Sequence, residues 1–377
     1  MTQPMFVWQR EDWPRFRVRE AQIASLLKEA RMAQGRVVGK AQALGLEAVG
    51  TALGEIWTAE AVATAAIEGE KLDLDAVRSS VARRLGLPMP AKVRHARNVE
   101  GLLDMMQDAL VKHAQPLTAK RLFAWQAALF PTGRSGLLKI RTGSWRTGSE
   151  PMQIVSGPIG KEKVHYEAPP ARDVPLLMRE FLRWFADSTK DRTDGLVRAA
   201  LAHLWFETIH PFEDGNGRVG RAIIDMVLAQ EEASTLPLYR MSSHLLANRK
   251  AYYDELNRAQ RGSLDVTPWV LWFVQQFHFA CHESEETIDQ SLIKARFWTR
   301  LAGMPISDRQ RKVINVLLDA GPGGFEGGLS AGKYQSLTST SRQTATRDLG
   351  DLVEKGVLSA TGQLKSTRYH VVVPEWQ

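Results

Sequence analysis

Cysteine is the scarcest chemically reactive residue of this chain, with Cys281 alone among 377 residues. A single thiol cannot close a disulfide within the chain, and it cannot supply a cysteine-rich metal site. Proteins of oxidising compartments often contain several paired cysteines, whereas a reducing compartment keeps thiols free. We therefore expect a cytoplasmic protein.

Long apolar runs are missing as well. The most apolar stretch, Trp269 to Val274, is too short to cross the roughly 30 Å hydrocarbon core of a bilayer. The first residues, MTQPMFVWQREDWPRF, lack the basic-then-apolar order and the small-residue cleavage site of a secretory signal. We expect a soluble protein that is not exported and has no membrane partner.

Charge of one sign is only modestly in excess, at a formal net +7. Such a surplus favours polyanions, including nucleic acid and nucleotide phosphates. A basic protein can equally carry these charges on an ordinary solvated surface. The net charge therefore does not choose between functions.

Helical periodicity dominates the first 300 residues, with no internal repeat or low-complexity tract. The segment 143–170 breaks the pattern, because short β-prone runs alternate with Gly and Pro, and it is predicted to form a hairpin or flap. We predict a mainly helical, all-α fold. Helices are expected near 18–42, 53–68, 72–84, 92–114, 117–129, 174–187, 195–208, 219–230, 243–260 and 267–293.

The pattern changes at about Pro305, where three helical segments are followed by two β-like runs. This is the order of a winged helix-turn-helix over 305–377, with Ser341 to Lys355 as its recognition helix. Two interpretations stay open: a DNA-binding regulator, or a module for protein interaction or homodimerisation. For DNA, the expected contacts are Arg342, Gln343, Thr344 and Arg347 in a major groove, and Lys365 and Arg368 on phosphates.

The string HPFEDGNGRVGR, residues 210–221, carries the strongest chemical signal. Glycines allow a loop whose N–H groups face an anion, and the helix expected to follow adds a favourable dipole. The alternative is a capped helix start with His210 as a core histidine, which the added Pro, Phe and spaced arginines make less favourable. The candidates are His210 as a proton acceptor, Asp214 for Mg²⁺, Gly215 and Gly217 in the loop, and Arg218 and Arg221 for phosphates.

This string resembles the signature of the Fic family, HPFx(D/E)GNGRxxR, and matches it at every fixed position. The similarity to neighbouring segments extends over roughly residues 50–290. It implies an all-helical Fic core with a β-hairpin flap. The domains expected are an N-terminal helical extension at 1–50, a catalytic core at 51–295 with its flap near 144–170, and the winged helix at 305–377.

The resemblance also implies an activity, protein adenylyltransfer, in which AMP passes from ATP to a Ser, Thr or Tyr hydroxyl of a target protein. Mg²⁺ would be the cofactor and ATP the substrate. Family members that phosphorylate instead depart from the GNGR portion, which is intact here. The implied roles are His210 as general base, Asp214 as Mg²⁺ ligand, Phe212 as buried anchor, Gly215, Asn216 and Gly217 as anion hole, and Arg218 and Arg221 as ligands of the phosphate chain.

Two further sites rest on the same resemblance. An adenine pocket is implied around Tyr252, Tyr253, Leu256 and Gln260, although the same spacing suits ordinary core packing. Edge-on pairing of the flap with an extended target peptide is the second. It would use Gln153, Ile154, Val155, Ser156 and Gly157.

An upstream segment, Thr64 to Gly69, matches the family's inhibitory motif (S/T)xxxE(G/N) in a helix near 55–69. Thr64 and Glu68 stand four residues apart, so they share one helix face. The resemblance implies that Glu68 competes with the γ-phosphate for Arg221 and restrains the enzyme. In some relatives this glutamate can orient a water that removes AMP from a modified protein, so removal of AMP is an alternative direction.

Overall fold

A computed structural model describes residues 6–43, 46–88, 95–156, 163–190, 193–322, 324–325, 327–363 and 366–376. The chain forms two compact units, Met1–Glu285 and Glu286–Gln377. The N-terminal segment expected as a separate extension shares the first unit with the motif-bearing region. The proposed residues Gly157 and Lys365 lie outside the described residues.

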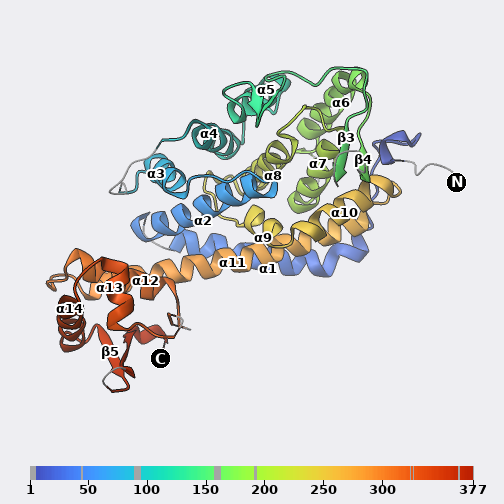
Figure 1. The fold of residues 1–377 in the computed structure, drawn as a ribbon. Helices are drawn as coiled ribbons and strands as arrows, with labels where there is room; N and C mark the ends of the chain where they lie inside the picture. The colour runs from blue at the N-terminus through green and yellow to red at the C-terminus, as the bar shows by residue number, and fades with distance from the viewer. Residues whose placement is uncertain are drawn as a thin grey trace. The chain divides into compact units, whose positions relative to one another are not determined.

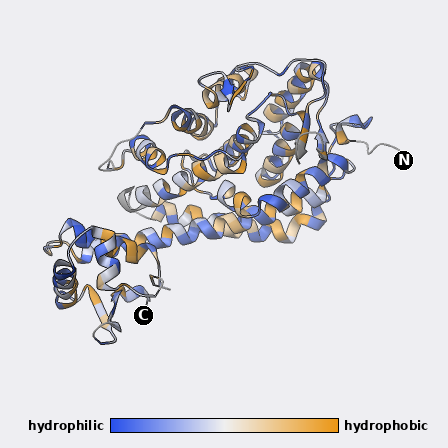
Figure 2. Cartoon of the chain, viewed as in Figure 1, coloured by the Kyte–Doolittle hydropathy of each residue, from blue (hydrophilic) through white to orange (hydrophobic). Residues whose placement is uncertain are grey.

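The first unit is built of helices, which confirms the predicted fold class. Figure 2 shows apolar and polar residues alternating along these helices, as expected of amphipathic segments that bury one side. The helical elements of this unit, of which Figure 1 labels the α-helices, follow in chain order. They are η1 (Val7–Gln9), α1 (Glu20–Ala43), α2 (Leu46–Ile67), α3 (Leu74–Leu85), α4 (Arg97–Val111), α5 (Ala119–Leu129), η2 (Ala171–Asp173), α6 (Val174–Asp187), α7 (Gly195–Ile209), α8 (Asn216–Glu232), α9 (Met241–Ala247), α10 (Arg249–Arg261) and α11 (Thr267–Arg300), which continues into the second unit.

The centre of the first unit is the pair α7 and α8, which pack along each other. Almost every residue of α7 is buried, so this helix is apolar around most of its circumference. Gly220 permits the close approach, since a Cβ there would lie 2.5 Å from Glu207 Oε1 and 3.0 Å from His203 Nδ1. The motif loop joins these two helices and is held on both sides.

The start of the chain is fixed to this core by aromatic and backbone contacts. The rings of Trp13 and Phe16 meet Trp205 of α7 edge-on. The amide of Arg17 donates to Leu264 O at 2.7 Å. These contacts fasten the N-terminal segment to α7 and to the loop before α11.

Local signals explain several helix boundaries. The carboxylate of Asp73 accepts from the first N–H groups of α3, and Gly86 ends that helix in a left-handed conformation. Thr118 and Asp194 cap α5 and α7 in the same way. The single helix expected at 243–260 is wrong, because the chain breaks at Asn248 into α9 and α10.

The flap is an antiparallel hairpin of β3 (Gln153–Ser156) and β4 (Lys163–Glu167), with an irregularity between Ile154 and Val155. Its base is anchored by the buried Tyr166, whose hydroxyl donates to Thr208 O at 2.6 Å. A smaller hairpin, β1 (Arg134–Ser135) with β2 (Leu138–Lys139), was not predicted from the sequence.

The second unit contains the C-terminal part of α11, then three helices and a hairpin around its own apolar core. A backbone bridge between Leu329 and Tyr369 extends the hairpin. This is the element order expected of a winged helix-turn-helix. The elements are α12 (Asp308–Asp319), α13 (Ala331–Thr338), α14 (Arg342–Glu354), β5 (Leu358–Thr361), β6 (Arg368–Val371) and η4 (Pro374–Trp376).

Within the described part of the chain, no helix combines the length and the apolar character needed to cross a bilayer.

Candidate active site

The motif loop turns sharply between α7 and α8. His210 ends α7 in a left-handed conformation with φ of 50°, and Gly215 precedes α8 with φ of 92°. The side chain of Asn216 bridges the loop: it donates to Phe212 O and accepts from Phe212 N, both at 2.9 Å. The amide side chain of Asn216 therefore shapes the loop from within.

Two buried side chains hold this loop against the core. Phe212 is fully buried and packs against the ring of Trp145, with centroids 5.2 Å apart. The buried Arg146 donates through Nε to His210 O at 2.8 Å, and its backbone N–H donates to Pro211 O at 2.9 Å. Arg146 was not predicted as a site residue, because nothing in its local sequence indicates a partner 64 residues away.

His210 lies beside a buried carboxylate of α7. Its Nδ1 is 3.7 Å from Glu207 Oε2, beyond hydrogen-bond distance but within ion-pair range. Burial alone would raise the pKa of Glu207, yet the surrounding His210, His203 and Arg221 hold that pKa below its ordinary value. Glu207 is therefore a charged neighbour of His210, and nothing in the local sequence identified it.

Asp214 is partly exposed and partly held by the loop. Its carboxylate accepts from Gly215 N at 2.5 Å and from the hydroxyl of Ser135, and it lies 3.5 Å from Arg218. No group of three His, Cys, Asp or Glu side chains suited to a metal occurs among the described residues. A lone accessible carboxylate suits Mg²⁺, which usually keeps waters and binds substrate phosphates in addition to one or two carboxylates.

Arg221 is held by the end of α2. Its Nη2 lies 2.8 Å from Glu68 Oε1 and donates to Thr64 O at 2.8 Å, while its Nε donates to Thr64 Oγ1 at 2.7 Å. Burial opposes the charge of Arg221, but the Glu68 carboxylate raises its pKa above the ordinary value. The sequence-predicted residues Thr64, Glu68 and Arg221 are thus brought together.

The Glu68 carboxylate also covers the start of α8. A Cβ at Gly217 would lie 2.1 Å from Glu68 Oε1, so only glycine leaves room for the carboxylate there. Gly69 takes a left-handed conformation, with φ of 81°, directly after Glu68. The segment expected to be inhibitory and the expected anion hole therefore lie in contact, at Glu68 and Gly217.

Arg218 has a carboxylate partner that the sequence analysis did not identify. Glu70 Oε2 lies 2.8 Å from Arg218 Nη1, and its other oxygen accepts from Asn98 Nδ2 at 2.9 Å. The guanidinium also lies 4.9 Å from the centre of the Phe130 ring. Both arginines of the motif are thus paired with glutamates from one short turn.

The residues expected around adenine lie on α10 in different environments. Tyr252 is buried, and its hydroxyl lies 2.8 Å from His203 Nε2, which is a core contact. Tyr253 is less buried and donates to Ile67 O at 3.3 Å, beside the end of α2. Gln260 is 2% exposed, and its Nε2 has no partner among the described residues. Tyr253 is therefore the member of this group beside the inhibitory turn.

In the flap, β3 pairs only with β4 among the described strands. Gln153 turns its amide toward Glu167 of the partner strand, at 2.9 Å. The side chains of Val155 and Ser156 lie outside what the structure describes. The second backbone edge of β3 pairs with no other described strand, and the peptide pairing expected from the sequence stays a prediction.

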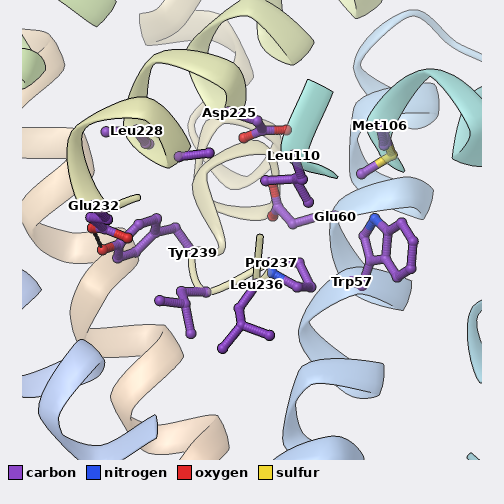
Figure 3. Close-up of a pocket in the computed structure, with 12 residues that line it drawn as sticks. Trp57, Glu60, Met106, Leu110, Asp225, Leu228, Glu232, Leu236, Pro237 and Tyr239 are labelled. Carbon is purple, nitrogen blue, oxygen red and sulfur yellow. Dashed lines mark hydrogen bonds between the residues drawn. The ribbon is translucent and has the colours of Figure 1, made fainter. Parts of the chain in front are cut away.

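A small cavity of about 20 Å³ lies beside α8, one turn after Arg221, as Figure 3 shows. Asp225 faces Glu60 across it, and the buried Trp57 Nε1 has no partner among the described groups. Glu60 accepts from the N–H groups of Ser242 and Ser243 and so caps α9. Removal from water and the nearby Glu60 raise the pKa of Asp225 well above its ordinary value.

The buried loop, the glycine-lined start of α8 and its two arginines lie together in one helical domain, and a helix start of this kind suits an anion. Residues 116–228 match the model of the Fic/DOC family, and residues 6–87 match a domain of unknown function (DUF4172). The segment 116–228 is therefore similar to the Fic/DOC family.

Similar proteins agree with this assignment. The chain is 31% identical over 101 residues to a probable protein adenylyltransferase of Aquifex aeolicus, covering 27% of this chain and 28% of that protein. It is 24% identical over 231 residues to the protein adenylyltransferase Fic of Nematostella vectensis, covering 60% of this chain and 47% of that protein. The matches thus span less than half of these relatives.

Solved structures share the fold. A Fic family protein from Desulfovibrio desulfuricans aligns with a TM-score of 0.56 at 23% identity, covering 95% of this chain and 98% of that one. A Fic domain containing signaling protein from Bacteroides thetaiotaomicron aligns with a TM-score of 0.53 at 16% identity, covering 69% and 97%. These likenesses establish the fold.

Proposed function

We propose that this protein transfers AMP from ATP to a Ser, Thr or Tyr hydroxyl of a target protein and that Glu68 restrains the reaction. The observation that carries the proposal is the pairing of both motif arginines with carboxylates at the start of α8. Carboxylate oxygens occupy the positions where phosphate oxygens would bind. The names of the Aquifex and Nematostella relatives support the same activity.

In this proposal the target hydroxyl oxygen attacks the α-phosphorus, the bond to the bridging oxygen breaks, and pyrophosphate leaves. His210 accepts the hydroxyl proton, supported by the Glu207 charge 3.7 Å away. The N–H groups at Gly215, Asn216 and Gly217 stabilise charge on the α-phosphate. Asp214 would hold Mg²⁺, which neutralises charge on the phosphates when bound.

The two arginines would then hold the rest of the nucleotide. Arg218 binds the phosphate chain and Arg221 the γ-phosphate, once Glu70 and Glu68 release them. Tyr253 and Gln260 are proposed to contact adenine, and the free edge of β3 to align the target peptide. The flap would position the backbone of the target peptide, and the sequence of the target would decide which hydroxyl is modified.

Restraint of AMP transfer follows because Glu68 and the γ-phosphate would share Arg221 as their partner. While Glu68 pairs with Arg221, the γ-phosphate has no cation at that end of the site, so ATP binds in an unproductive position. Thr64 adds two contacts to the same guanidinium and holds it in the restrained geometry. Removing the Glu68 carboxylate is expected to activate transfer.

Labelled ATP tests the proposal. The Glu68→Ala protein is incubated with α-labelled or γ-labelled ATP in a cell extract, and labelled proteins are separated and identified. AMP transfer gives label from the α position alone. Label from the γ position alone would mean phosphorylation and would contradict the proposal.

Two control variants separate the roles. Glu55→Ala removes an exposed carboxylate from the same helix and should leave labelling at the wild-type level. Glu68→Ala combined with His210→Ala should lose the label. Equal labelling by Glu55→Ala and Glu68→Ala would contradict restraint by Glu68, while the proposed AMP transfer would still stand.

Removal of AMP is a second candidate, favoured by the position of the Glu68 carboxylate over Gly217. A carboxylate there would lie beside an α-phosphate at the start of α8 and could orient an attacking water. Wild-type protein offered a target modified by the Glu68→Ala variant would then release AMP. Retention of all the label under these conditions would exclude this direction for that target.

A further inference from the structure

The second unit presents one helix face that its own packing does not use. Helix α14 buries Ala345, Asp348, Leu349 and Leu352 in the core of the unit. The opposite side, over its first turns, is exposed. This exposed stripe, called the α14 face below, consists of Arg342, Gln343, Thr346 and Arg347.

The acidic residues of α14 are turned away from this face. Asp348 is buried, accepts from Tyr334 Oη at 2.9 Å and pairs with Arg309 at 3.3 Å. Asp351 accepts from Gln310 Nε2 at 2.7 Å and pairs with Lys355 at 2.6 Å. The only exposed carboxylate of the helix is Glu354 at its far end. The first turns of α14 are therefore positive.

Many other cations of the unit have internal partners. Lys312 donates to Leu337 O at 2.6 Å, and Arg311 lies 4.1 Å from the centre of the Trp298 ring. Arg368, expected on phosphates, donates through Nε to Gly327 O at 2.9 Å. By contrast, Arg347 is 75% exposed and reaches a carboxylate only at 3.9 Å, in Asp348. The α14 face thus places two exposed arginines, Arg342 and Arg347, on one side of a single helix.

A groove adjoins this face. It has a volume of about 400 Å³ and lies among the start of α13, helix α14 and strand β6. Its polar lining includes Ser330, Arg342, Thr346 and Thr367, and none of its described lining residues carries a carboxylate. A helix start, hydroxyl groups and an arginine together suit a backbone phosphate.

The geometry points to duplex DNA as the partner of the second unit, with the α14 face in the major groove and the adjoining groove on the phosphate backbone. The side chains fit this partner in type, because Arg pairs with guanine, Gln with adenine, and a Thr methyl contacts thymine. Thr344, predicted on this face, instead joins the helix cap with Ser341. Thr346 takes its place.

DNA retention by the full chain tests this inference. The probe is a library of duplexes with random central sequence, incubated with wild type, with R342A/R347A, or with R296A. Arg296 is exposed on α11 of the same unit and outside the α14 face, so its loss is a control for charge. Equal thermal unfolding of the proteins shows that all are folded.

Wild type is expected to retain duplexes at about 50 mM salt and to lose affinity steeply toward about 200 mM. R342A/R347A should bind about 10-fold or more weakly at low salt, while R296A stays near wild type. Gln343→Ala should change which sequences are enriched. No retention by wild type at low salt, or equal loss in both arginine variants, would overturn the inference.

A second copy of the chain is the competing occupant. Sedimentation without DNA separates it: a wild-type dimer that R342A/R347A converts to monomer, and R296A does not, would assign the α14 face to self-association. That result would also overturn the DNA inference.

Discussion

The pairing of Glu68 with Arg221 makes a prediction that separates ATP from ADP. If Glu68 occupies the position of the γ-phosphate, Glu68→Ala should strengthen the binding of ATP but leave ADP binding nearly unchanged. ADP lacks the group that competes for Arg221. The Glu68→Ala substitution removes only the carboxylate from this contact, because Thr64 still accepts hydrogen bonds from the Arg221 guanidinium.

The size of the effect follows from burial. The Arg221 side chain is 3% exposed and the Glu68 side chain 28%, so the pair lies between a surface and a buried ion pair. Surface pairs contribute about 0–1 kcal/mol, whereas breaking a buried pair costs about 3–5 kcal/mol. A value of about 1–3 kcal/mol is reasonable here, which corresponds to about 5- to 150-fold in ATP affinity.

The measurement is titration calorimetry with Mg²⁺ and either nucleotide, using His210→Ala in every protein to prevent turnover. The Glu55→Ala variant is the matched control on α2. Unfolding of the nucleotide-free protein gives a second measure, because Glu68→Ala leaves Arg221 buried without a carboxylate and should lower the Tm.

Equal strengthening of ATP and ADP binding would refute the reasoning. It would mean that Glu68 obstructs the site as a whole through its contact with Gly217. No change in either affinity would show that the pair does not compete with nucleotide at all.

Three further predictions concern other contacts of the site. Glu70→Ala frees Arg218 and should strengthen ADP and ATP binding alike, by about 2- to 10-fold for a partly exposed pair, measured in the same titrations with Glu55→Ala as control. Asn216→Ala removes both bonds to Phe212 and should lower the free energy of unfolding by about 2 kcal/mol in urea, and unchanged stability would mean that the loop holds its shape without them. Asp225→Asn should raise the Tm by about 3 °C near pH 8 and by less toward pH 4, in thermal scans across this range. The sign follows because a carboxyl with a raised folded-state pKa favours its protonated form, so wild-type stability falls as pH rises from the unfolded pKa through the folded one. A gain that is constant with pH would contradict that assignment.

Features that depend on local chemistry could be predicted from the sequence. The mainly helical fold follows from the 3.6-residue period, and the caps at Asp73 and Thr118 mark helix starts that lie within two residues of those expected. The glycines and arginines of 210–221 indicated an anion site before any geometry was known. Family resemblance added Glu68, which composition alone could not distinguish from a solvated helix end.

Features that depend on long-range contacts could not be predicted. Glu70 is 148 residues from Arg218, and nothing in its local pattern indicates the pairing. Glu207 is one turn before His210, but its role depends on burial between α7 and α8. The break at Asn248 has no signal in the local sequence, since asparagine alone does not end a helix.

Glu68 and Glu70 flank Gly69, so the contacts with Arg221 and Arg218 share one three-residue turn. A displacement of that turn frees both cations in a single step, and restraint should therefore be lost all at once. Helix α2 is also fastened to the start of α9 through Glu60, two turns before Glu68, so the turn is joined to α9 through one helix.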